Sequence, residues 1–116
     1  MISKQDITGA LDSCGIPWAE PSFAPRKPPE PPYALVLDTY EYDGSDMHIG
    51  MIGHDTRILL HDIGDSSGRA TRYALAVALA SANVHFTQYP ADYNYDLKLY
   101  QSEYEIDETY YEKWSE

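Results

Sequence analysis

The chain has 116 residues, 43% of them apolar, which supports one domain with one modest core, predicted to span residues 1–116. Its net charge of −11 excludes binding to DNA through a basic patch, and its single cysteine, Cys14, excludes an internal disulfide and a cysteine-only metal site. With no apolar run of about 18 residues and no basic-then-apolar leader, the sequence predicts no membrane span and a cytoplasmic origin.

The N-terminal segment, residues 1–15, is predicted to form a helix over about residues 4–14. Ser3 stands where an N-cap is expected, and Asp6 follows at the position of an acidic capping partner. Apolar residues then recur with helical spacing, and Gly15 followed by Pro17 ends the helix.

Residues 16–32 form a proline-rich arm, with seven of the eight prolines between Pro17 and Pro32. Because proline lacks the N–H that a sheet ladder needs, strand pairing is expected to begin at Tyr33. The arm has no repeat and is not expected to form a packed element alone. Its large apolar residues, Trp18 and Phe23, need cover, which leaves two alternatives open: packing onto the domain's own sheet or docking on a neighbouring subunit.

Residues 33–109 are predicted to form a sheet plus one helix. Alternation indicates strands at 33–42, 47–52 and 55–62, with a turn at Asp43–Asp46 and a break or bulge at 53–54.

The second half of this region continues with a helix at about 69–82, and Asn83 after it suits a left-handed stop. The wide apolar arc of this helix suits a sheet and a neighbouring subunit. Strands follow at 84–88 and 97–107, separated at 89–96 by a turn region or a frayed continuation of the strand, and residues 110–116 are expected to be an acidic, solvated tail. The order predicts an α+β fold: a mainly antiparallel sheet of about four to five strands, an N-terminal helix and a second helix packed on one face.

No catalytic constellation is recognisable in the sequence. His54 and His61 are seven positions apart in one extended segment, which places them on opposite faces and argues against a metal site. No glycine loop of phosphate-binding spacing and no nucleophile elbow is present. We therefore expect no enzyme activity, no cofactor and no metal.

The layout resembles the small tail-completion, or tail-terminator, proteins of long-tailed bacteriophages. The resemblance covers nearly the full chain and rests on an N-terminal helix ending at Gly15, a proline-rich lead into a tyrosine strand, and an acid-and-tyrosine strand near the end. The segments that carry it are Pro28–Tyr33, Leu37–Asp46, Asp55–His61, Leu99–Gln101 and Glu103–Ile106.

The resemblance implies a structural virion protein at the head–tail junction. Such a protein forms a six-fold ring that stops growth of the tail tube and joins it to the head connector, and DNA passes through without specific binding. Its partners are then further copies of itself, the major tail tube protein and the head connector or head-closure protein. The expected interface residues are Trp18, Phe23, Tyr33, Tyr40, Tyr42, Asp43 and Asp46, and the expected acidic channel lining is Asp38, Glu41 and Asp46.

Two physical arguments agree with this reading. An acidic chain repels phosphate, as a DNA channel must, and a ring needs two different complementary surfaces on each subunit. The alternatives are a head-closure or other minor tail component, and an acidic inhibitor that mimics DNA or docks on a basic enzyme. The inhibitor hypothesis predicts acids spaced regularly on one exposed face and salt-sensitive binding.

Overall fold

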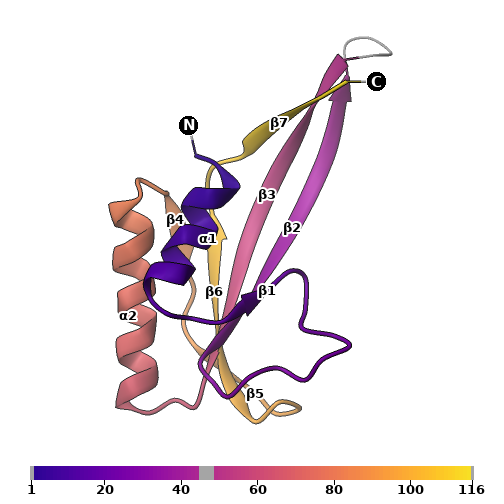
Figure 1. The fold of residues 1–116 in the computed structure, drawn as a ribbon. Helices are drawn as coiled ribbons and strands as arrows, with labels where there is room; N and C mark the ends of the chain where they lie inside the picture. The colour runs from indigo at the N-terminus through magenta and orange to yellow at the C-terminus, as the bar shows by residue number, and fades with distance from the viewer. Residues whose placement is uncertain (1, 45–48, 116) are drawn as a thin grey trace.

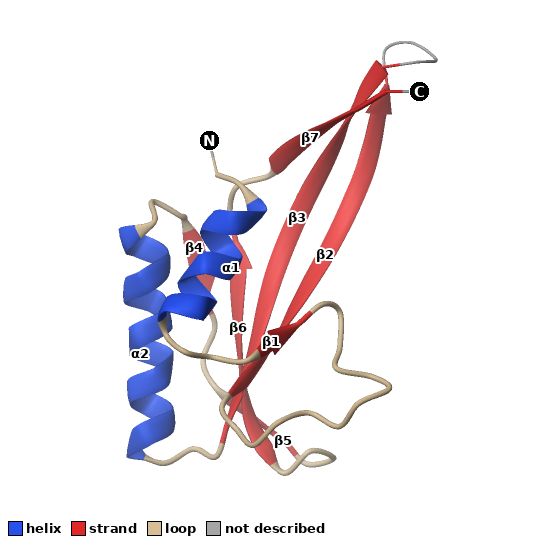
Figure 2. Cartoon of the chain, viewed as in Figure 1, coloured by secondary structure: helices blue, strands red, loops and turns tan. Residues whose placement is uncertain are grey.

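A seven-stranded, mainly antiparallel sheet carries two helices, which pack together over one of its faces (Figure 2). The computed structural model describes the backbone of residues 2–44 and 49–115, and the side chains of residues 2–42 and 51–111. The predicted α+β class is confirmed, with more strands than the four to five expected. The elements are α1 (Lys4–Ser13), β1 (Trp18–Ala19), β2 (Tyr33–Gly44), β3 (Ile49–Asp62), α2 (Ser66–Ser81), β4 (Phe86–Gln88), β5 (Asp92–Asn94), β6 (Leu99–Ile106) and β7 (Tyr110–Ser115).

Both helices begin at side-chain caps. The Ser3 amide donates to Asp6 Oδ2 at 2.8 Å and the Asp6 amide donates to Ser3 Oγ at 3.4 Å, which confirms the predicted capping box of α1. α2 begins earlier than predicted because Asp65 caps it, accepting from the Gly68 amide at 2.8 Å. After α2, Asn83 has a φ of 60°, the left-handed stop that the sequence indicated.

The strands β2 and β3 form a long hairpin that pairs from Tyr33 opposite His61 to the far end of β2. The predicted break at 53–54 is wrong, and so is the division into strands at 47–52 and 55–62, because β3 is continuous. Its Gly53 is paired on both edges, with Glu41 of β2 and with Tyr111 of β7. Pairing on both sides, with the Tyr111 ring against the glycine, holds this residue extended despite its intrinsic freedom.

The C-terminal segment is a strand, so the expectation of a solvated tail at 110–116 is wrong for its backbone. β7 pairs with the distal half of β3, between Ile49 and His54. β6 pairs with β3 only from Arg57 to Asp62, which leaves the distal edge of β3 open for another strand. The acidic composition of the tail predicted exposure of its side chains, but it carries no information about this backbone partner.

Two short strands were also missed. β1 lies in the proline arm and pairs in parallel with Ala34 and Leu35 of β2. β5 lies where a turn region or a frayed continuation of the preceding strand was expected, and it pairs with the first residues of β6, which itself begins at Leu99 rather than at Leu97. Both strands are too short to show a periodic pattern, so only the neighbouring strand edge reveals them.

The core lies between the sheet and the helices. Leu75 and Leu79 of α2 are fully buried against strand residues such as Ile58, Leu60 and Tyr104. Beyond this core the β2–β3 hairpin extends past both helices to one end of the molecule, and β7 runs along it (Figure 1). The molecule is therefore elongated, with principal extents of 51 × 33 × 21 Å.

Candidate functional site

The aromatic residues of the proline arm pack onto their own chain. Trp18 lies against the core and its Nε1 donates to Asp12 Oδ1 at 2.8 Å. The Phe23 ring meets the Tyr33 ring edge-on at 5.6 Å, and Tyr33 stacks on His61 at 4.9 Å. Of the two alternatives that the sequence left open for this arm, the structure shows packing on the domain's own sheet. A further contact with another subunit stays a prediction.

Tyr33 itself offers little surface for an interface. It is only 4% exposed, and burial raises the pKa of its hydroxyl above the ordinary value. Burial likewise lowers the pKa of His61 against the opposing effect of its hydrogen bond with Gln101. This ring stack is therefore an internal anchor for the arm rather than a surface.

The hairpin tyrosines are open to solvent. Tyr40 is 57% exposed and Tyr42 is 65% exposed, and their rings meet edge-on with centroids 6.1 Å apart. Tyr40 also lies 5.7 Å from the His54 ring. The backbone of Asp43 continues β2, whereas its side chain and the whole of Asp46 lie outside the described residues. The hairpin thus presents two adjacent aromatic rings on one side of β2.

Asp38 does not stand on an open surface, which corrects its expected role in lining a channel. Its side chain is 11% exposed, and Oδ2 lies 2.7 Å from His54 Nδ1. The His54 ring stacks on Tyr110 at 4.6 Å. Asp38 points to the face of the sheet that carries the helices, because it alternates in phase with the buried Ala34 and Val36.

The opposite, helix-free face of the sheet is acidic, and we call it the acid face. Arg57 lies among its carboxylates and contacts Glu103 at 3.3 Å. Hydroxyl groups donate to three others: Thr109 to Asp55, Tyr89 to Glu105 and Thr87 to Asp107. The acid face comprises Glu41, Asp55, Glu103, Glu105 and Asp107.

Only Glu41 of this face was singled out from the sequence. A signal for two others existed, since alternation along the last strand turns Glu103 and Glu105 to the face opposite the apolar Tyr104 and Ile106. What the sequence lacked was the strand register. That register pairs Asp55 with Thr39, the residue of β2 that precedes Glu41 on the same face. It also pairs Glu105 with Arg57.

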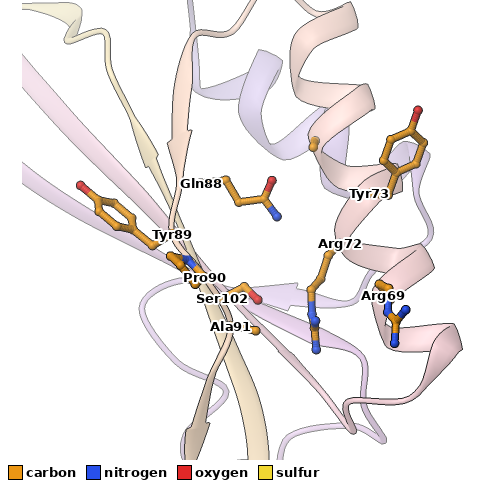
Figure 3. A pocket seen from close by; sticks show the side chains of 9 residues that line it. Arg69, Arg72, Tyr73, Gln88, Tyr89, Pro90, Ala91 and Ser102 are labelled. Carbon is orange, nitrogen blue, oxygen red and sulfur yellow. The ribbon is translucent and has the colours of Figure 1, made fainter.

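A groove lies between α2 and the segment that joins β4 to β5, on the helix side of the sheet (Figure 3). Its volume is about 420 Å³. The Gln88 amide extends towards α2, where its nitrogen donates to the Tyr104 hydroxyl at 3.2 Å, whereas the Tyr89 ring points away from the groove (Figure 3). The lining residues are Arg69, Arg72, Tyr73, Ala76, Gln88, Tyr89, Pro90, Ala91 and Ser102.

Two polar groups of the groove differ sharply in their partners. Arg72 donates to both carboxylate oxygens of the buried Asp62, each at 2.7 Å, and these bonds raise the pKa of its guanidinium. Ser102 is fully buried at the base of the groove, and its hydroxyl has no hydrogen-bond partner among the residues that the structure describes. An unpaired buried hydroxyl is unusual and calls for a physical explanation.

The outward side of α2 is apolar. Tyr73 is 73% exposed and Val77 is 46% exposed, with the exposed Ala70 and Ala74 beside them. The sequence grouped Tyr73 and Val77 in the wide apolar arc of this helix. The structure puts Leu75 and Leu79 against the sheet and leaves the stripe of Tyr73 and Val77 facing solvent.

Comparisons with known proteins add no neighbour: no family model matches the chain, and no curated protein or solved structure is significantly similar to it. Among the described side chains, those of residues 2–42 and 51–111, no three His, Cys, Asp or Glu groups gather as a metal site would need. In the same part of the chain, no helix combines the length and apolar character required to cross a bilayer.

Proposed function

We propose that this chain is a structural tail-terminator protein of a long-tailed bacteriophage, which forms a ring on the tail tube and joins it to the head connector. The observation that carries the proposal is the β2–β3 hairpin, which extends beyond the helices and carries the exposed Tyr40 and Tyr42 on its distal half. Long exposed strands invite aggregation unless another surface covers them, so a projecting hairpin in a chain of this size is best explained by a binding partner. Tyrosine is also among the residues enriched at protein interfaces.

The acid face supports the same proposal. A ring through which DNA passes needs a lining that does not hold phosphate, and carboxylates repel it. Glu41, Asp55 and Glu105 lie on one side of one sheet, so turning that side inward lines a channel without any change of fold. Asp38 has no part in this lining, because it is paired with His54 on the other side.

Electron microscopy of the purified chain mixed with tail tubes of its phage tests the proposal. Ring density at the end of the tube, between tube and connector, is the expected result. Density elsewhere in the particle would instead favour a head-closure or other minor tail role. Complete absence from particles would overturn the structural reading.

The acid face also favours a second candidate, an acidic inhibitor that mimics DNA. Its carboxylates are fixed by neighbouring strands on one exposed face, the arrangement that such an inhibitor requires. The two functions differ in their partner: the inhibitor binds a basic nuclease or repressor tightly, and that binding weakens steeply with salt. Replacing Asp55 and Glu105 by their amides would abolish inhibitor binding but leave assembly on tail tubes intact.

A further inference from the structure

We propose that the groove between α2 and the β4–β5 connection receives Tyr42, near the distal end of β2 in the β2–β3 hairpin, from a second copy of this chain. The inference rests on the proposed ring and names the contact that closes it. The distal end of the β2–β3 hairpin lies at one end of the elongated molecule, whereas the start of α2, which carries Arg69 and Arg72 of the groove, lies towards the other (Figure 1). They cannot meet within one chain, so a contact between them joins two copies head to tail.

The groove has the chemistry of a tyrosine site. Its walls include Ala76, Pro90 and Ala91, which suit the ring, and its volume of about 420 Å³ leaves room for an aromatic side chain. At the base, the Ser102 hydroxyl is buried without a partner among the described residues. A tyrosine hydroxyl both donates and accepts, so it satisfies this group once the lining side chains shift to admit it.

Charge favours the same pairing. From residue 43 to residue 51 the hairpin has two acids, Asp43 and Asp46, and neither lysine nor arginine. The groove has two arginines at its edge, and Arg69 is exposed and makes no ion pair with any described residue. In a chain of net charge −11, this arginine-bearing groove is a favourable place for an acidic hairpin to approach.

The geometry also meets the requirement of a closed ring. Hairpin and groove are different surfaces, so their contact is heterologous, the type that generates rings when the rotation closes. Each copy gives one hairpin and receives another. A symmetric dimer through a single shared surface would not have this property.

Sedimentation velocity of matched variants, alone and with tail tubes, tests the contact. Tyr42→Ser removes a hairpin ring, and Arg69→Glu reverses the charge at the groove; both sites are exposed, so the fold is expected to survive. Each variant should associate roughly tenfold or more weakly than the unaltered protein, as is typical of interface hot spots. Tyr95→Ser is the control, because Tyr95 is 83% exposed, lies between β5 and β6 outside the hairpin, and does not line the groove.

Mixing the two variants gives the sharpest readout. The Tyr42→Ser protein keeps its groove and the Arg69→Glu protein keeps its hairpin, so the mixture should form one-to-one pairs that grow no further. A third variant, Ser102→Ala, should weaken association without lowering the stability of the monomer, since its hydroxyl has no described partner to lose.

The outcomes separate the contact from the function. Assembly on tubes that Tyr42→Ser and Arg69→Glu leave unchanged would overturn the hairpin–groove contact while the terminator function stands. Head-to-tail association that depends on both residues, in a protein absent from tails, would support the contact and overturn the function. No association under any condition would overturn both.

Discussion

The ion pair between Arg72 and Asp62 fastens α2 to the end of β3, and its removal is the most informative test of stability. Asp62 is 2% exposed and Arg72 is 19% exposed, and two hydrogen bonds of 2.7 Å join them. The variant Arg72→Met keeps most of the aliphatic stem but leaves the carboxylate buried without its cation. The perturbation is therefore mainly electrostatic.

The expected loss follows from the isolation of Asp62. Breaking a buried pair by removing one partner costs about 3–5 kcal/mol, because the remaining charge has lost its compensation. Asp62 Oδ1 keeps one donor, the Gly64 amide at 2.7 Å, which places the cost near the lower end, at about 3 kcal/mol. For a domain of this size that loss lowers Tm by roughly 10–15 °C.

Chemical denaturation and thermal melting of three variants measure this effect. Arg69→Met is the matched control, since Arg69 is exposed on the same helix and should change stability by less than about 0.5 kcal/mol. The double variant Arg72→Met, Asp62→Asn removes both charges and should recover part of the loss. A loss below about 1 kcal/mol for Arg72→Met, or no recovery in the double variant, would show that the Asp62 carboxylate does not depend on Arg72 for its compensation.

The contacts of two glycines and of Tyr104 also contribute to stability. Gly68→Ala should destabilise the fold by about 1–3 kcal/mol, because its Cβ would lie 2.5 Å from Asp62 Oδ1. Gly9→Ala in α1 should stabilise the fold by about 0.5–1 kcal/mol, because its Cβ meets nothing within 4 Å and alanine favours a helix. Tyr104→Phe should cost about 1–2 kcal/mol through the lost bonds to the Arg72 carbonyl and the Gln88 amide, and calorimetry would measure it. Burial raises the pKa of Tyr104 above its ordinary value of 10.0. The free energy of unfolding should therefore fall as pH rises above 10, and this fall should be smaller in the Tyr104→Phe protein.

Each of these predictions has a contradicting result. Equal stability of the Gly68→Ala and Gly9→Ala proteins would contradict the close approach of α2 to Asp62. A stability curve of Tyr104→Phe parallel to that of the unaltered protein between neutral and strongly alkaline pH would show that Tyr104 ionises as easily in the folded state as in the unfolded state.

Short-range sequence patterns are enough to predict the local elements. The capping box at Ser3 and the left-handed stop at Asn83 depend on residues within a few positions of one another, so short-range rules predicted them. Alternation likewise places Thr56, Ile58 and Leu60 on one face of their strand, and the structure shows that face to be buried. From these elements alone the α+β class followed, as did the exposed tyrosines of the hairpin as candidates for an interface.

Which strand edges and faces meet depends on pairing between distant parts of the chain and is seen only in the folded structure. β3 passes through Gly53 without a break because β2 and β7 pair with it on both sides, and the acidic tail becomes β7 because β6 leaves part of β3 open. Asp38 and Glu41 lie close together on one acidic strand, yet register and burial make the first an internal partner of His54 and leave the second exposed on the acid face. Such pairings join residues far apart in the chain, and no local pattern encodes them.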